Sequence, residues 1–261
     1  MKKNIITFTT DWGTKDHYVA TVKAKLLSLI NKDITFVDVS HHIAPLQVFQ
    51  AAFVLKNCMY FFPKGTVHII SVRAEATPQN PHVVVQHNDS YFIGSDNGVF
   101  NLLFDKFDKA YEIDVFQDSD YFTFPARDVF AKVAATIIND GKISNIGHEI
   151  TKLNSQIGYF NPANTLNSIV GVVIHIDNYG NIITNISFEE FKKVVKNQKF
   201  TISFGNYIIE EINTSYIDVP DGEIIALFNT SGLLEIAQNN GNIASLLGIK
   251  FNDIVKINIE E

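Results

Sequence analysis

The sequence predicts an α/β N-terminal domain with a largely parallel sheet, followed by a smaller C-terminal β-barrel domain. Over residues 1–155, short β-branched runs alternate with runs that repeat apolar residues at helical spacing, and the connections are short. Over residues 168–261, short apolar runs are separated mainly by turn residues. The polar stretch 156–167 between them contains Asn and Pro and is interpreted as a linker.

The first strand is expected at Ile5–Thr10, with a helix after it. Apolar residues recur there at the spacing of one helix face: Val19, Val22, Leu26, Leu29 and Ile30. Thr14 or Asp16 is the expected N-cap, because hydroxyl and carboxylate oxygens accept the free N–H groups of a first helical turn.

A second strand, a second helix and a third strand follow. The strands are expected at Ile34–Val39 and Thr66–Val72. Between them, Pro45 is expected in the first turn of a helix whose buried stripe includes Val48 and Leu55. Strands and helices that alternate with short connections predict a parallel sheet with right-handed crossovers.

The remainder of the first half contains a hairpin, a turn and a long helix. Residues 82–86 and 91–93 are expected to pair around Asn88-Asp89. Ser95-Asp96-Asn97-Gly98 is a strong turn signal that opens an amphipathic run. The last elements expected in this half are a strand at 110–115 and an apolar helix at 128–139 that ends near Gly141.

In the second half, the most informative stretch is the turn Asp177–Asn181. Strands are expected at 169–176, 182–186, 200–204, 207–210, 223–228 and 254–259, with one short helix at 189–196. The turn separates the first two strands and contains a carboxylate, amides and an aromatic ring. Its side chains either satisfy the backbone of the turn or present a rigid surface to a planar polar ligand such as a nucleoside.

Two other turns follow predicted strands and contain polar groups. Asp11 stands directly after the first strand, and ligands of parallel sheets bind at the carboxyl ends of strands. Helix capping explains an aspartate there equally well. Asn229-Thr230-Ser231-Gly232 can offer N–H groups and hydroxyls to a carboxylate or a ribose, and a plain turn is the alternative.

Composition argues against several other classes of protein. A net charge of −7 and a pI of about 5.6 argue against a nucleic-acid partner, which requires a basic face. The apolar runs are too short to span a membrane or to form a signal peptide, so we expect a cytoplasmic protein.

The histidines lack zinc-ligand spacing, and neither a Gly-rich phosphate loop nor a Gly-x-Ser-x-Gly elbow is present. We therefore expect no metal and no cofactor. The single cysteine, Cys58, is interpreted as a buried structural thiol.

Several motifs together carry a family resemblance. In chain order they are Thr10-Asp11-Trp12-Gly13, Val37-Asp38-Val39-Ser40-His41, Phe62-Pro63-Lys64-Gly65-Thr66-Val67-His68, Asp96-Asn97-Gly98, Arg127-Asp128, Ile176-Asp177-Asn178-Tyr179-Gly180-Asn181 and Asn229-Thr230-Ser231-Gly232-Leu233-Leu234-Glu235-Ile236-Ala237. They cover nearly the whole chain. The sequence resembles the S-adenosyl-L-methionine (SAM) hydroxide adenosyltransferases, a family that also contains SAM-dependent chlorinases and fluorinases.

The resemblance implies a homotrimer that takes SAM as a substrate. SAM would lie between the N-terminal domain of one subunit and the C-terminal domain of its neighbour. The residues that the resemblance assigns to substrate binding are Asp11, Asp16, Asn97, Phe124, Asp177, Tyr179, Asn181, Asn229 and Thr230.

The resemblance also implies a division of roles. Asp11 would bind the ribose hydroxyls, while Asp16, Asp177 and Thr230 would hold the methionine end. Recognition or stacking of the adenine would fall to Asn181, Tyr179 and Phe124.

The nucleophile side departs from the family pattern. The hydrolases of the family carry an Asp in a Val-Asp-Pro-Gly-Val-Gly-like loop, an Arg shortly after it, and a His in a His-Gly-Arg-Asp motif. In this chain Arg73 stands at the Asp position, Asn80 is nearest to the Arg position, and Pro125 replaces the His. The halogenases place small or hydroxyl-bearing residues there, a pattern that Arg73 and Glu75 do not copy.

Two functions therefore remain open. In the first, water or hydroxide attacks ribose C5′ of SAM, with Glu75 as the candidate base and Arg73 as the candidate orienting cation. The alternative for this pair is an ion pair on an exposed loop. In the second, the chain binds SAM or adenosine without turnover. Family analogy favours cleavage.

Overall fold

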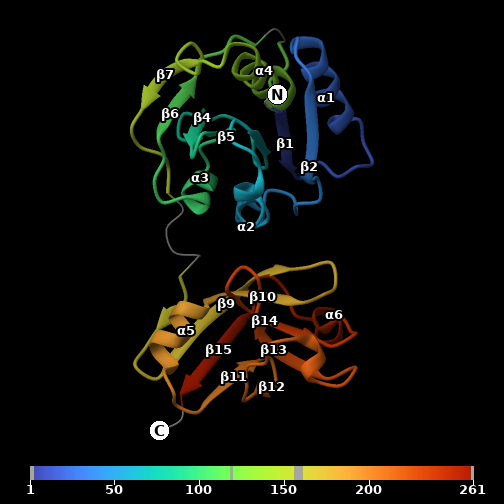
Figure 1. Ribbon diagram of the computed structural model, residues 1–261, viewed down its shortest axis with the longest axis vertical. Coiled ribbons are helices and arrows are strands. Elements are labelled where there is room, and N and C mark those ends of the chain that lie inside the picture. The colour runs from blue at the N-terminus through green and yellow to red at the C-terminus, as the bar shows by residue number, and fades with distance from the viewer. Residues whose placement is uncertain (1–2, 118–119, 156–160, 260–261) are drawn as a thin grey trace. The chain divides into compact units, whose positions relative to one another are not determined.

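The computed structural model describes residues 3–117, 120–155 and 161–259 (Figure 1). The chain divides into two compact units, residues 1–157 and 158–261. The expected linker, 156–167, lies partly outside the described residues. In its described part, the short strand β8 (Ala163–Asn164) pairs with β9 (Ser168–Ile176).

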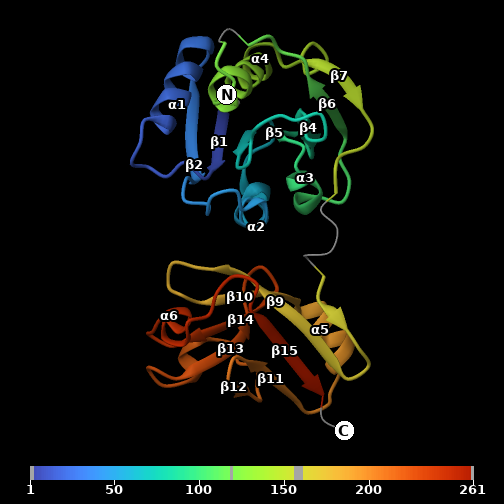
Figure 2. The same ribbon diagram turned by 180° about the vertical axis from the view of Figure 1, so that it is seen from behind.

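The first unit is built on a mixed sheet that is parallel in its first half. In the described part of this unit, seven strands follow the order β2-β1-β3-β5-β4-β6-β7 (Figures 1 and 2). They are β1 (Asn4–Thr10), β2 (Ile34–Ser40), β3 (Val67–Ser71), β4 (His82–His87), β5 (Ser90–Ser95), β6 (Lys109–Ile113) and β7 (Gly147–Ile150). The pairs β2–β1, β1–β3 and β3–β5 are parallel, and the others are antiparallel. The expected α/β architecture is confirmed.

Helices cover both faces of this sheet (Figure 1). They are α1 (Tyr18–Leu29), α2 (Val48–Lys56), the 3₁₀ turn η1 (Met59–Phe61), α3 (Val99–Leu103), the π-helical turn η2 (Ala126–Phe130) and α4 (Ala131–Asp140). Helices α1 and α4 pack together against one face, where Leu26 and Ile137 join Ile6 and Phe8 of β1 in the main core. Helices α2 and α3 pack together on the other face. Cover on both faces explains why β1 and β3 are buried along nearly their whole length and not at alternate residues.

The expected N-cap of α1 is wrong. The helix begins after His17, whose side chain makes no capping hydrogen bond, and neither Thr14 nor Asp16 caps it. The reason is that the chain beyond β1 stays in a loop, where the N–H of Gly13 donates to the carbonyl of His41 at 2.6 Å. Asp16 is left exposed in that loop.

The expected start of α2 is also too early. Pro45 lies in a turn, and the helix begins at Val48. The intervening Leu46 has a positive φ of 66°, and its N–H donates to the Asp11 carboxylate at 3.0 Å. A left-handed residue interrupts a helix, because its backbone cannot continue right-handed turns.

The second unit is an antiparallel sheet curled around one core. Its strands are β8 and β9, β10 (Ile182–Ser187), β11 (Phe200–Phe204), β12 (Tyr207–Ile209), β13 (Ile224–Phe228), β14 (Leu233–Gln238) and β15 (Ile254–Ile259). Their order is β12-β11-β15-β9-β10-β14-β13, with β8 beside β9. Residues from most strands, including Ile169, Ile186, Ile202 and Ile236, meet in a single core. The sheet is nearly closed, which confirms the expected barrel.

Short helices complete the second unit. They are α5 (Phe188–Val195), the 3₁₀ turn η3 (Tyr216–Asp218) and α6 (Ile243–Leu247). Ser187 is the N-cap of α5, and its hydroxyl accepts the N–H of Glu190, as expected for a serine at this position. Strand β14 and helix α6 were not expected from the sequence.

The pH dependence of stability should contain a contribution from His68, which is fully buried in β3. Its Nδ1 lies 2.8 Å from the Thr7 hydroxyl, and burial lowers its pKa from 6.5 to about 3. Between these values the unfolded chain binds the extra proton, so stability decreases as the pH falls from 6.5 toward 3. One proton contributes at most about 1.4 kcal/mol per pH unit.

Urea unfolding of the wild type and of a His68→Asn variant between pH 7 and pH 5 checks this contribution. Asparagine places a polar atom where His68 Nδ1 contacts Thr7, but it does not titrate. We expect the free energy of unfolding to depend less steeply on pH in the variant. If the free energy of unfolding has the same slope against pH in both proteins, His68 is not the group that takes up the proton.

Candidate functional site

The first unit contains a small cavity at the carboxyl ends of its parallel strands, here called the Asp11 cavity. Its volume is about 140 Å³. Its lining comes from Asp11 and Trp12 after β1, Leu46 after β2, Ser71 and the loop 73–75 at the end of β3, and Thr123–Pro125 before η2. This is the edge at which α/β sheets bind ligands. The structure thus brings together Asp11, Arg73, Glu75 and Phe124.

The Asp11 carboxylate has one oxygen engaged by protein. Its Oδ2 accepts the N–H of Leu46, whose backbone is left-handed. Among the described residues, no hydrogen bond uses its Oδ1. The carboxylate is therefore oriented by the backbone on one side and available to a ligand on the other.

The loop after β3 is held from behind by side chains. Arg73 has a positive φ of 48°. The amide nitrogen of Asn97 donates to the carbonyls of Val72 and Arg73, both at 3.0 Å, and Nε2 of His82 lies 2.8 Å from the carbonyl of Ala74. Strained backbone of this kind persists only where its surroundings fix it, and it concentrates at functional sites. Asn97, expected to contact the substrate, is buried and supports this loop.

Arg73 and Glu75 are both exposed at the cavity. The loop ion pair considered from the sequence is not formed, since no ion pair of the described residues joins these two side chains. The Arg73 guanidinium and the Glu75 carboxylate therefore both lie at the Asp11 cavity without pairing with each other.

Aromatic rings form one wall of the Asp11 cavity. Phe124 contacts Trp12 edge to face at 5.4 Å between ring centroids, and Trp12 stacks on His41 at 6.0 Å. His41 is buried, with Nδ1 2.7 Å from the Thr10 hydroxyl and Nε2 3.1 Å from Asp38. Burial lowers the pKa of His41, so the ring is neutral near pH 7.

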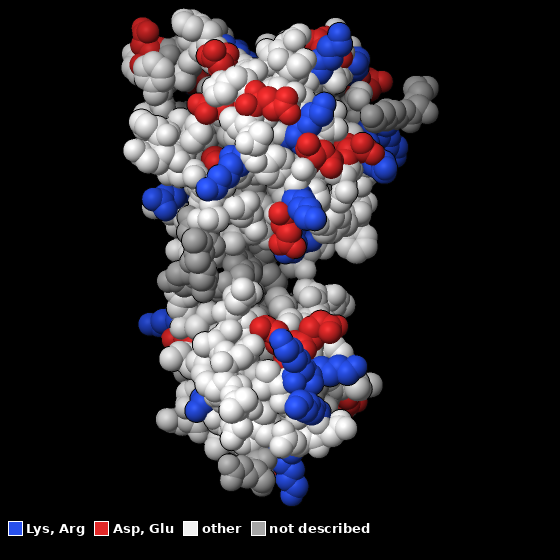
Figure 3. All heavy atoms as spheres, turned by 90° about the vertical axis from the view of Figure 1, so that its left-hand side faces the viewer, with Lys and Arg blue, Asp and Glu red and all other residues white. Residues whose placement is uncertain are grey.

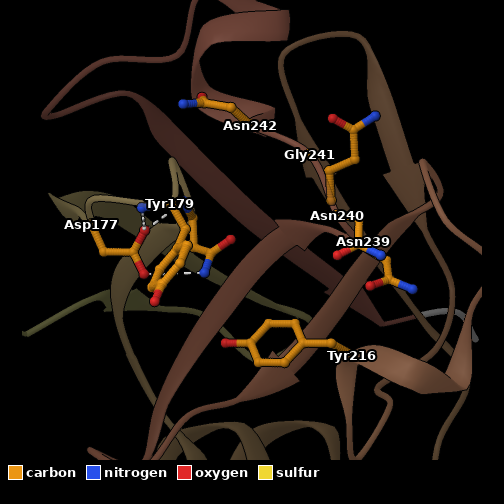
Figure 4. A pocket seen from close by; sticks show the side chains of 9 residues that line it. Asp177, Tyr179, Tyr216, Asn239, Asn240, Gly241 and Asn242 are labelled. Atoms are coloured by element: carbon orange, nitrogen blue, oxygen red, sulfur yellow. Dashed lines mark hydrogen bonds between the residues drawn. The ribbon is translucent and has the colours of Figure 1, made fainter.

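The second unit contains a larger cavity, here called the Asn181 cavity (Figure 4). Its volume is about 670 Å³, within the range of small-molecule sites. The residues that line it are Asp177, Tyr179, Asn181, Tyr216 and Gln238–Asn242. The structure thus brings together the three residues predicted from the Asp177–Asn181 turn.

Both interpretations of this turn apply. Asp177 satisfies its own loop, because Oδ1 accepts the N–H groups of Tyr179 and Asn181, both at 2.9 Å. Its Oδ2 accepts the Asn181 side-chain amide at 3.1 Å. Asn181 is buried, and within the described residues its Oδ1 has no hydrogen-bond partner. The ring of Tyr179 is 75% exposed. The turn is self-supporting and still presents an amide oxygen and a ring to the cavity.

A glycine fixes this turn against the opposite wall of the cavity. Gly180 has a φ of +84°, and a Cβ added there would lie 2.1 Å from Oδ1 of Asn242, the N-cap of α6. The carbonyl of Gly180 also accepts the N–H of Ala244 at 3.1 Å. No side chain fits between the turn and the helix.

Replacing Gly180 with alanine should therefore cost more stability than backbone strain alone. Gly222 is a matched control, with a φ of +86° and no atom within 4 Å of an added Cβ. We expect Gly222→Ala to lose about 1 kcal/mol of unfolding free energy and Gly180→Ala roughly 3 kcal/mol, because overpacking adds to strain. Urea titration measures both, and equal losses would contradict the steric argument.

A buried carboxylate connects the Asn181 cavity to the turn between β13 and β14. Glu235 accepts the Tyr216 hydroxyl at 2.5 Å with one oxygen and the Asn229 amide at 3.1 Å with the other. Asn229 closes its own turn, since its Oδ1 accepts the N–H of Ser231 at 2.9 Å. The neighbouring Thr230 is exposed. Neither Asn229 nor Thr230 lines the cavity.

Tyr216, which lines the cavity, and Glu235, which accepts its hydroxyl, were not singled out from the sequence. Tyr216 gave no signal in a polar stretch without periodicity. Glu235 did give one, a single charge within the apolar run Leu233–Ala237. Asp16, which was expected at the methionine end, lies in the exposed loop before α1 and lines neither cavity.

The described residues contain no group of three His, Cys, Asp or Glu side chains placed to hold a metal ion. None of their helices has the length and apolar content that crossing a membrane requires. On the face shown in Figure 3, Lys and Arg side chains are interspersed with Asp and Glu. The expected cytoplasmic location and lack of a nucleic-acid partner stay predictions.

Comparison with known proteins gives the same result for both units. Residues 6–147 match the model of the SAM hydroxide adenosyltransferase N-terminal domain, and residues 171–256 match that of the C-terminal domain. A protein of Methanocaldococcus jannaschii named (R)-S-adenosyl-L-methionine hydrolase is 30% identical over 97% of this chain and 95% of its own. A fluorinase of Actinopolyspora mzabensis is 24% identical over 97% and 96%. The crystal structure of an uncharacterized conserved protein from Thermotoga maritima superposes with a TM-score of 0.85 at 28% identity, covering 97% of this chain and 99% of that one.

Proposed function

The chain belongs to the SAM hydroxide adenosyltransferase family, and from this premise we propose that it cleaves SAM into adenosine and L-methionine. Water or hydroxide attacks ribose C5′, the new C5′–O bond forms as the C5′–S bond breaks, and the electron pair passes to sulfur. The positive sulfonium becomes a neutral thioether, and the attacking water loses one proton. The observation that supports this most is the family match over both units, together with relatives named SAM hydrolase.

In this proposal Asp11 orients the ribose. Its carboxylate is fixed by Leu46 on one side and open on the other, so it can accept hydrogen bonds from vicinal hydroxyls. Holding the ribose sets C5′ in line between sulfur and the nucleophile, and such positioning can supply much of the rate. Phe124 and Trp12 form an apolar wall that keeps bulk water from the reacting carbon.

The adenine is proposed to bind in the Asn181 cavity. The free Oδ1 of Asn181 can accept from the exocyclic amino group of the base, and the rings of Tyr179 and Tyr216 offer apolar faces. Asp177 lines the same cavity and, with Thr230 and Asp16, is proposed to hold the methionine end. Asn229 contributes by shaping the turn that presents Thr230.

The nucleophile side belongs to the loop after β3. Glu75 is proposed to take the proton from water, and Arg73 to orient the water, because both lie at the Asp11 cavity without forming an ion pair with each other. Asn97 is proposed to act through this loop, whose carbonyls it holds.

Neither cavity alone contains all of these groups. The Asp11 cavity, at about 140 Å³, is below the usual size for a small-molecule site, and the adenine-binding groups are on the other unit. We propose that the complete site forms in a homotrimer, where the first unit of one subunit faces the second unit of its neighbour.

The test is to incubate the purified protein with SAM in H₂¹⁸O and follow the products by chromatography and mass spectrometry. Cleavage at C5′ by water gives methionine and adenosine that carries ¹⁸O at its 5′ oxygen. Calorimetric binding of SAM without product would favour a module that binds but does not turn over. Release of adenine, or unlabelled adenosine, would reject attack at C5′ by water.

A further inference from the structure

Glu235 is a buried carboxylate that the proposed chemistry does not use. It lies in β14, is 4% exposed, and is flanked by the buried residues Leu234 and Ile236. No Lys or Arg side chain of the described residues forms an ion pair with it. Removing a carboxylate from water without pairing it with a cation costs on the order of several kcal/mol, unless hydrogen bonds compensate. The hydrogen-bond donors to Glu235 therefore indicate which parts of the structure it holds.

The first donor is the hydroxyl of Tyr216. Burial and the hydrogen bond to Glu235 raise the pKa of Tyr216, so its hydroxyl stays protonated and donates to the carboxylate. Tyr216 opens η3, which Asp218 closes by accepting the N–H groups of Thr214 and Ser215, both at 2.9 Å. Asp218 thus fixes the backbone that carries Tyr216, and Glu235 fixes its hydroxyl. The ring lines the Asn181 cavity together with Tyr179 (Figure 4).

The second donor is the side-chain amide of Asn229. Its orientation is fixed, because its Oδ1 already accepts the N–H groups of Ser231 and Leu233, at 2.9 and 3.3 Å. The Nδ2 group must therefore face Glu235. In this way one carboxylate ties the 229–233 turn to the ring of Tyr216.

We propose that Glu235 is a positioning residue that locks the Tyr216 ring and the 229–233 turn in one arrangement before substrate binds. This inference rests on the proposed function, since it assigns the ring to the adenosine half of SAM and the turn to the methionine half. If both elements are already fixed before binding, less conformational entropy is lost when the substrate binds. Glu235 should therefore increase the affinity for the substrate. Glu235 itself touches no reacting atom.

Glutamine and phenylalanine substitutions separate the two hydrogen bonds. In Glu235→Gln, the amide oxygen can still accept from Tyr216, while the amide nitrogen meets the nitrogen of Asn229 and cannot accept from it. Tyr216→Phe keeps the ring and removes only the hydroxyl. The double variant reports whether the two changes are coupled through the Glu235 side chain, which both hydrogen bonds share.

We expect each single variant to raise KM for SAM about tenfold while kcat stays within about threefold, because preorganised binding is lost and the chemistry is untouched. The melting temperature should fall modestly in Tyr216→Phe, because the buried carboxylate loses one of its donors, and the variant should stay folded at the assay temperature. The double variant should be less impaired than the product of the single effects. An unchanged KM, independent effects of the two changes, or equal losses in KM and kcat alongside a lower melting temperature would overturn the proposal.

Calorimetric titration with adenosine keeps this inference separate from the proposed function. If the wild type binds adenosine but releases no product from SAM, the function fails while the variants still test Glu235. Weaker adenosine binding in Tyr216→Phe and Glu235→Gln then supports the positioning role. Unchanged adenosine affinity in both variants overturns it.

Discussion

Replacing Asp11 with asparagine is expected to lower kcat/KM for SAM by at least about 100-fold. In the variant, the single side-chain oxygen would accept the N–H of Leu46. The group that faces the ribose would then be an NH₂ donor in place of a carboxylate oxygen that accepts. Two charge-assisted hydrogen bonds of about 1.5–3 kcal/mol each would be lost, and one alone corresponds to roughly a tenfold to hundredfold change. Both kcat and KM should worsen, since the ribose contact also aligns C5′.

Asp33→Asn is the matched control for this variant. Asp33 is exposed just before β2, at the amino end of the parallel strands and away from the Asp11 cavity. The control should keep wild-type kinetics, and both variants should keep the wild-type melting temperature. Steady-state measurement of adenosine release decides the matter. An Asp11→Asn enzyme with wild-type kcat/KM would exclude Asp11 from the site.

The architecture could be predicted from the sequence because its elements are strongly periodic. The β4–β5 hairpin follows from Asn88-Asp89, whose φ angles of 50° and 61° are those that a two-residue hairpin turn requires. Strand β14 was missed because it begins inside the run that starts at Asn229, where turn residues dominate the pattern. Its charged Glu235 further obscured a strand whose other residues are mainly apolar.

The site could be predicted only in part, because distant contacts decide it. The strand-end position of Asp11 follows from topology alone. The left-handed backbones of Leu46 and Arg73 do not, since both residues normally avoid positive φ and are held there by Asp11 and Asn97. Sequence separations of this length leave no local pattern. The same holds for Glu235 and Tyr216. The segment before η3 lies beside β13, where Asn213 bridges to Leu227, and Leu227 pairs with Glu235 on β14.

Replacing Glu75 with glutamine is expected to lower kcat by about 10² to 10⁴, the usual contribution of a general base. Glutamine keeps the size and polarity of the side chain, and Glu75 makes no ion pair within the described residues, so KM and stability should change little. The rate of the variant should increase with pH, because hydroxide attacks without needing a base.

Glu149→Gln, an exposed change on β7, should keep the wild-type rate and pH profile. The comparison requires kcat from pH 6 to pH 10 for all three proteins. A Glu75→Gln enzyme as fast as the wild type would mean that the water is activated elsewhere, and Arg73 would then be the remaining group of the loop able to lower the energy of a bound hydroxide.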